Sequence, residues 1–206
     1  MPLTADRHAA LARRARRLSW LGLVWIGAEG IVAIAAGLAA GSVALIGFGV
    51  DSAIEGFASL VIIWRFTGSR LLSSAAERRA QRLVAAQFFL LAPYVAVEAV
   101  LALVGGHRPD PTWIGIFLAA TSAVGMPLLG AAKRRVGEQL GSAATRGEGM
   151  QNVLCGMLAG ALLVGLLANA LLGAWWLDSV VALLIAGVAV REGVQAWRGD
   201  GCACHA

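Results

Sequence analysis

The stretch VALIGFGVDSAIEGFASLVIIWRF, residues 43–66, decides how this chain folds. It is long enough for a spanning helix, because about 20 apolar residues at about 1.5 Å per residue cross the hydrocarbon core of a bilayer. Two acids, Asp51 and Glu55, interrupt it, and its first basic residue is Arg65, next to its end. We therefore predict a transmembrane helix over residues 43–66 that carries two carboxylates inside the membrane.

Five more apolar runs predict five more spanning helices. Of the 206 residues, 59% are hydrophobic and 14% are charged, whereas soluble domains hold about 45–50% apolar and about 25% charged residues. This composition argues against a soluble helical protein and predicts an all-α, polytopic membrane protein with six transmembrane helices. The five further helices are expected over residues 18–40, 83–104, 113–132, 147–172 and 175–191, with a proline-containing loop over residues 105–112.

The basic residues predict the orientation of the helices. Of the 17 Lys and Arg residues, 16 flank the predicted helices on one side, and only Arg108 lies on the other. Such a bias marks the cytoplasmic side, so both termini are expected in the cytoplasm. Because the basic residues flank apolar segments, we interpret them as topology signals, and no nucleic-acid partner is expected. Membrane lipids are the expected surroundings.

Acids within the predicted helices indicate a path for cations. A charge inside a bilayer costs about 2.5–3.5 kcal/mol on insertion scales. No Lys or Arg is expected in the middle of a helix, since Lys133 is taken to end the fourth one. Buried acids without basic partners must be protonated, hydrated or bound to cations. The acids within or at the rim of helices are Glu29, Asp51, Glu55, Glu98, Glu148, Asp178 and Glu192.

Two pairs of these polar residues have the spacing of one helical face. Asp51 and Glu55 are four residues apart, and so are Glu148 and Asn152. Residues at this spacing stack on one side of a helix, so two helices could together offer four ligands to a metal. The alternatives are a structural polar cavity around the first pair and, for Glu148, an ordinary residue at the membrane surface.

Segments from three predicted helices resemble the cation diffusion facilitator family. They agree with that family in order and spacing, and the resemblance extends over about residues 18–198. The segments are GSVAL at 41–45 with VDSAIE at 50–55, EGMQNV at 148–153, and WLDSVVAL at 176–183 followed by Glu192 and Trp197.

The resemblance implies a transporter rather than an enzyme. Members of this family are expected to form homodimers that move a divalent metal, often zinc, out of the cytoplasm in exchange for protons. We accordingly expect a transmembrane cation-transport domain over residues 18–198, set in a bacterial plasma membrane and without a prosthetic group. Carried over by position, the transport-site metal ligands would be Asp51, Glu55, Glu148 and Asn152.

The chain departs from the family pattern in several places. Glu55 replaces the usual Asp, Glu148 a common His or Asp, and Asn152 an Asp. These four residues provide oxygen ligands only, which suit Mn or Fe(II) as well as Zn, with Cd also considered. The usual cytoplasmic C-terminal domain is not expected in this chain.

The two ends of the chain are predicted to differ from the membrane part. Residues 1–17 form a basic cytoplasmic segment, and residues 199–206 form a cytoplasmic tail. Cys202, Cys204 and His205 in that tail could capture a soft metal, or could be a chance run in a terminus. The third cysteine, Cys155, is interpreted as a small buried hydrophobic residue.

The depth of the two pairs poses a geometric problem. Asp51 lies 14 residues before the first basic residue of its loop, Arg65, whereas Glu148 lies two residues after Arg146. On straight helices of equal depth the two pairs would not meet, and this conflict would ease if the fourth and fifth helices extend into the cytoplasm and a wet cavity reaches the site. Two other functions stay open: a non-transporting scaffold or partner subunit of the same fold, and a membrane-embedded acid–base enzyme that uses Asp51 and Glu55.

Overall fold

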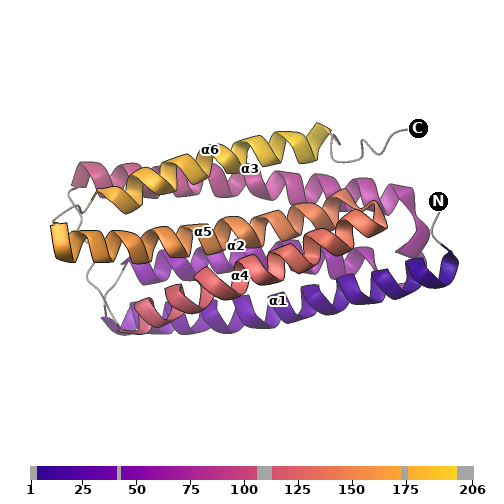
Figure 1. Cartoon of the computed structure of the whole chain (residues 1–206), viewed down its shortest axis with the longest axis horizontal. Helices are drawn as coiled ribbons and strands as arrows, with labels where there is room; N and C mark the ends of the chain where they lie inside the picture. Colours follow the sequence, from indigo (N-terminus) through magenta and orange to yellow (C-terminus); the bar gives the residue numbers. More distant parts are fainter. Residues whose placement is uncertain (1–3, 41–42, 106–112, 173–175, 199–206) are drawn as a thin grey trace.

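The structure, a computed structural model, describes residues 4–40, 43–105, 113–172 and 176–198, and these are helical almost throughout (Figure 1). Six long α-helices follow one another, with one short 3₁₀ helix, η1, between the second and the third. Their bounds are α1 Ala5–Ala40, α2 Val43–Arg65, η1 Gly68–Leu72, α3 Ser74–Gly105, α4 Trp113–Leu140, α5 Ala143–Leu172 and α6 Leu177–Arg198.

The helices form one elongated bundle. Helix α1 packs against α2 and α4, α4 against α5, and α6 against α3 and α5. In Figure 1 α1 runs along one edge of the bundle and the α3–α6 pair along the other, with α2, α4 and α5 between them. Both chain ends lie at the same end of the bundle, as an even number of crossings requires.

Apolar side chains cover much of the outside of this bundle. Large residues such as Leu21, Ile31, Leu90 and Leu128 are more than half exposed. By length and composition, α1, α3, α4 and α6 are each able to cross a membrane, as judged on the described part of the chain. The chain is therefore an all-helical polytopic membrane protein, because an apolar exterior of this kind suits lipid and helices satisfy their own backbone hydrogen bonds there.

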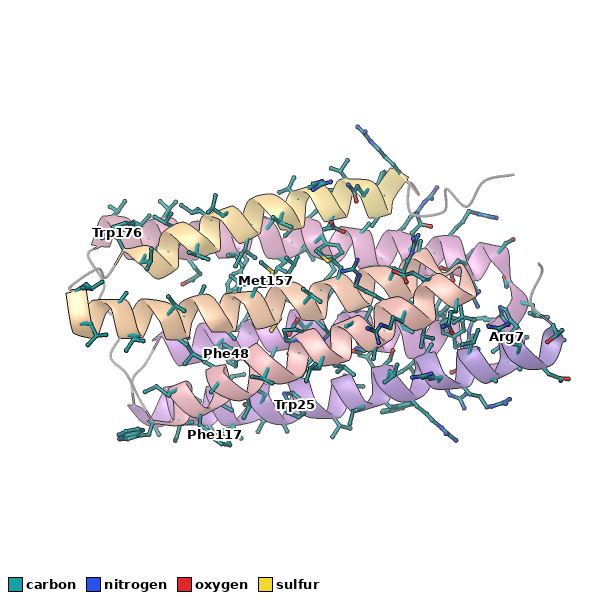
Figure 2. All side chains as sticks on the ribbon, viewed as in Figure 1. Arg7, Trp25, Phe48, Phe117, Met157 and Trp176 are labelled. Atoms are coloured by element: carbon teal, nitrogen blue, oxygen red, sulfur yellow. The ribbon has the colours of Figure 1, made fainter. Side chains whose placement is uncertain are left out.

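Basic side chains gather at one end of the bundle. Figure 2 shows Arg7 at the end where both termini lie, and Trp176 and Phe117 toward the opposite end. The start of α3, whose first turns carry Arg78 and Arg79, lies beside the turn between α4 and α5 at the same end, because Glu77 binds Ser142 and Ala144 there. The asymmetry predicted from the sequence is thus a physical property of the folded bundle, and it matches the cytoplasmic placement expected for this end.

The helices are longer at the basic end than the apolar runs predicted. Helix α1 begins at Ala5 rather than residue 18, α3 at Ser74 rather than residue 83, and α4 continues past Lys133 to Leu140. The apolar runs show where lipid ends, whereas a helix continues until a backbone signal stops it. Helices α4 and α5 thus extend beyond their predicted apolar runs, since α5 also begins at Ala143 rather than residue 147.

A tight turn of two residues joins α4 to α5. Gly141 adopts a φ of +64°, which favours glycine, and ends α4. The Ser142 hydroxyl oxygen then accepts a hydrogen bond from the Thr145 backbone N–H at 3.1 Å and caps α5. The turn keeps the two helices antiparallel and in close contact from their first residues.

Two glycines bring α4 and α5 together further along. A Cβ atom on Gly130 would lie 2.5 Å from the Gly149 carbonyl oxygen, and one on Gly149 would lie 2.7 Å from the Gly130 carbonyl oxygen. No side chain fits between the two backbones, so they cross at glycine contact distance. Lys133 lies about one turn after Gly130 on α4, and Glu148 directly precedes Gly149 on α5. The crossing therefore brings these two residues close together.

A polar cluster ties α2, α3 and α5 together at the basic end. The buried Arg65 guanidinium donates through Nε to Glu77 Oε2 at 2.8 Å. Glu77 Oε1 accepts from the Ser142 hydroxyl at 2.8 Å and from the Ala144 backbone N–H at 3.2 Å. One carboxylate therefore links the end of α2 and the start of α3 to the first turn of α5, and we call these residues the Glu77 clasp.

Candidate cation site

The two acids of α2 lie inside the bundle. Glu55 is 3% exposed, and Asp51, one turn earlier, is half-buried. Asp51 Oδ1 and Glu55 Oε1 have no hydrogen-bond partner among the residues that the structure describes. The pair therefore offers unused carboxylate oxygens in the interior, which is the arrangement that a cation or a proton would stabilise.

Cys155 of α5 is the residue that faces Glu55 from the neighbouring helix. Its thiol lies close to the Glu55 carboxylate, and the residue is 7% exposed and packs with Ile26 and Met126. The interpretation of Cys155 as a small buried hydrophobic residue is confirmed, but its closeness to Glu55 was not predicted. One signal was available: Gln151 and Cys155 are four residues apart on α5, as Asp51 and Glu55 are on α2.

Gln151 strengthens the polar character of this face of α5. It is 1% exposed, and both its amide nitrogen and its amide oxygen lack a hydrogen-bond partner in the described chain. Buried amides are normally hydrogen-bonded, since an unpaired one costs about 1–3 kcal/mol. Gln151 and Cys155, one turn apart on α5, are thus both buried, and α5 is the helix that approaches the acids of α2.

Glu148 and Asn152 are not free in this structure, because Lys133 of α4 binds both. Lys133 Nζ lies 2.7 Å from Glu148 Oε1 and 2.9 Å from Asn152 Oδ1, and Lys133 is 0% exposed. The Ser19 hydroxyl of α1 donates to Glu148 Oε2 at 2.8 Å. The expectation that no Lys or Arg lies mid-helix was wrong, because α4 continues past Lys133 and carries it into the interior.

The four predicted ligands therefore fall into two neighbouring groups. Asp51 and Glu55 lie one turn apart on α2, with Cys155 close to Glu55, whereas Glu148 and Asn152 bind Lys133. The groups are close enough for the charge of Lys133 to act on Glu55. In the described residues no three His, Cys, Asp or Glu side chains converge in the manner of a closed metal cage, and the assignment of these four residues as transport ligands stays a prediction.

The remaining candidate residues lie outside these two groups. Glu29 of α1 is buried and accepts a hydrogen bond from the Ser122 hydroxyl of α4 at 2.5 Å. Glu98 is exposed on α3, and Glu192 is half-buried on α6. The Asp178 side chain and the tail residues Cys202, Cys204 and His205 lie outside the described residues.

The fold and this interior together define a class of protein. This protein is a polytopic helical bundle with acids, a thiol and a lysine in its core. Ionisable residues inside a membrane bundle are typical of proteins that conduct or transport ions or protons. The family model of the cation efflux transmembrane domain matches residues 19–198, nearly the whole chain. The chain belongs to this family, the cation diffusion facilitators, whose members are transporters and not enzymes. No solved structure matches the chain.

Proposed function

We propose that this chain carries a divalent transition-metal cation, with zinc as the first choice, out of the cytoplasm in exchange for protons. The observation that supports this most is the buried acid pair of α2, in which Asp51 Oδ1 and Glu55 Oε1 have no partner among the described residues. A metal ion and a proton are alternative partners for such oxygens, so binding one releases the other. Exchange of metal for protons follows from that competition.

The donors around Glu55 favour zinc or cadmium over harder ions. Asp51 and Glu55 would provide oxygen, and Cys155, buried on α5, would add a sulfur donor for soft metals once a metal ion drew the three side chains together. Without a metal these three do not converge in the described chain. Zinc accepts both kinds of ligand. Mn and Fe(II), which suit an oxygen-only site, come second once Cys155 is included.

The setting of this transporter is part of the same proposal. Membership of the family favours a homodimer in the plasma membrane of a bacterium, with metal ions and protons as its ligands. The basic end of the bundle would face the cytoplasm, because positively charged residues are retained there. Metal would then enter the interior from the end that carries the Glu77 clasp.

Metal uptake into liposomes with an imposed proton gradient tests the proposal. Purified protein is reconstituted, and the initial uptake of Zn²⁺, Cd²⁺, Mn²⁺ and Fe²⁺ is followed for the wild type, Asp51→Asn and Glu55→Gln. We expect zinc uptake to fall at least about tenfold in both variants, because even outer partners of metal ligands contribute about 10–100-fold. Both substitutions preserve side-chain volume, so folding is little changed.

Glu138→Gln provides the matched control, since Glu138 is an exposed acid on α4 at the basic end. It should transport at the wild-type rate. Zinc uptake that survives Asp51→Asn and Glu55→Gln at the rate of this control would refute the site. Proton movement measured with an internal pH dye should start on zinc addition in the wild type, and its absence would refute exchange.

A second function, a non-transporting partner subunit of the same fold, is favoured by one observation. Lys133 fills the positions at Glu148 and Asn152 that a transported cation would otherwise take. If that ion pair is permanent, half of the predicted ligand set is never available. Folded wild-type protein that takes up none of the four metals, under either direction of the proton gradient, would support this function instead.

A further inference from the structure

The ammonium group of Lys133 has the surroundings of a bound cation. Glu148 Oε1 and Asn152 Oδ1 accept its hydrogen bonds at 2.7 Å and 2.9 Å, and no part of the residue is exposed. Ser19 fixes the other oxygen of Glu148. A carboxylate and an amide oxygen held in place by a second hydrogen bond are also what a metal ion would use.

Two further helices shape the space around this ammonium. A Cβ atom on Gly22 of α1 would lie 2.7 Å from Lys133 Nζ and 3.4 Å from the Ser59 hydroxyl oxygen of α2. Ser59 is one turn beyond Glu55 on the same helix, and both residues are buried. The ammonium therefore lies where α1, α2, α4 and α5 meet, next to the acids of the proposed transport site.

Stability alone does not explain a buried ion pair at this position. Replacing such a pair by apolar residues of similar volume is often neutral or stabilising, because two charges must be removed from water to form it. In hydrocarbon the need for charges is smaller still, since apolar residues cost nothing there. A lysine with a flexible four-carbon stem can, however, reach a site and withdraw from it.

We propose that Lys133 is a tethered cation that occupies the Glu148–Asn152 position and competes there with the transported metal. This inference rests on the proposed function and adds a specificity-determining residue to it. A divalent ion is attracted to Glu148 about twice as strongly as a monovalent one at the same distance, so it displaces the ammonium where Na⁺ or K⁺ does not. Lys133 thus restricts the site to divalent cations and sets how tightly they bind.

Two substitutions weaken this competitor in different ways. Lys133→Met removes the ammonium and leaves Glu148 with the Ser19 hydroxyl but without its charged partner. Gly22→Ala keeps both charges, but its Cβ would push the flexible end of Lys133 away from Glu148. Gly27→Ala on the same helix is the matched control, because a Cβ at Gly27 meets nothing within 4 Å.

Equilibrium binding of Mn²⁺, followed by its electron paramagnetic resonance signal in detergent, provides the measurement. Mn²⁺ prefers oxygen ligands, so its binding is sensitive to Glu148 and Asn152 as well as to Asp51 and Glu55. We expect its Kd to fall at least about tenfold in Lys133→Met and Gly22→Ala, because a tethered competitor acts at an effective concentration on the order of millimolar or more. Gly27→Ala should bind as the wild type does, and weak Na⁺ competition should appear only in the first two variants.

The outcomes separate this inference from the proposed function. If Asp51→Asn abolishes Mn²⁺ binding while Gly22→Ala and Lys133→Met bind like the wild type, the α2 site stands and Lys133 is only a structural partner of Glu148. If Gly22→Ala tightens binding and Asp51→Asn changes nothing, Lys133 is the competitor and the α2 site is wrong. Should Lys133→Met fail to fold, Gly22→Ala alone decides, since it retains the ion pair's charges.

Discussion

Replacing Glu77 by alanine should loosen the basic end of the bundle more than any other single surface change there. Glu77 is the only carboxylate bound to Arg65 in the described chain, and the two side chains are 17% and 7% exposed. The same carboxylate accepts two hydrogen bonds from the first turn of α5. One substitution therefore leaves a nearly buried guanidinium without a counter-charge and removes an acceptor from two donors.

The structure allows the size of this loss to be worked out. Breaking a fully buried ion pair costs about 3–5 kcal/mol, and the partial exposure of Glu77 lowers this to about 2 kcal/mol, since solvent screens the freed charge. The two hydrogen bonds add about 1 kcal/mol. The free energy of unfolding should thus fall by about 3 kcal/mol, which corresponds to a Tm lower by about 6–12 °C for a chain of this size.

Circular dichroism at 222 nm during heating in detergent measures this Tm. Glu77→Gln keeps an oxygen acceptor for α5 but loses the charge, so its Tm should lie between those of the wild type and Glu77→Ala. Glu138→Ala, at an exposed acid of α4, is the control and should melt with the wild type. If Glu77→Ala melts within about 2 °C of Glu138→Ala, a spread below 1 kcal/mol, the clasp does not stabilise the fold and the reasoning fails.

Three other perturbations test the interior. Cys155→Ser should lower Cd²⁺ uptake relative to Mn²⁺ uptake about tenfold in a competition assay, because the soft sulfur donor is lost; an unchanged ratio would remove Cys155 from the site. Gly156→Ala places a Cβ against the ring of Pro127 and should lower the free energy of unfolding by about 1–3 kcal/mol, as measured by thermal unfolding. Gly160→Ala is the control and should change it little, because no atom lies nearer than 4.0 Å to the new Cβ. Equal effects of the two substitutions would contradict the packing of α4 against α5. Gly141→Ala forces an L side chain to a φ of +64° and should lower the free energy of unfolding by about 1 kcal/mol in the same assay. A Tm equal to that of the wild type would contradict the left-handed conformation of this turn.

The Glu77 clasp and the interior site are connected through α5. Ser142 and Ala144 bind Glu77 in the first turn of α5, and Glu148 follows one turn later. A substitution that releases the start of α5 therefore also acts on the helix that carries Glu148, Asn152 and Cys155. Measuring Mn²⁺ binding in Glu77→Gln would show whether the two regions are coupled energetically.

The sequence by itself determined the class of the fold and predicts its orientation in the membrane. Runs of about 20 apolar residues are local signals, and the choice of lipid or water for such a run does not depend on what packs against it. The bias of basic residues is also visible along the chain without any contact. The same holds for the spacing of Asp51 and Glu55, because four residues bring two side chains to one face of any helix.

Only the tertiary structure decided which residues face those acids. Two pairs on α5 have the same spacing of four residues, Glu148 with Asn152 and Gln151 with Cys155. The sequence alone does not show which of these pairs points toward α2. The glycine crossing at Gly130 and Gly149 fixes the depth and rotation of α5 against α4. That packing brings Lys133 to Glu148 and leaves Cys155 for Glu55. Helix depth and rotation follow from contacts between distant residues, and such contacts exist only after the bundle has formed.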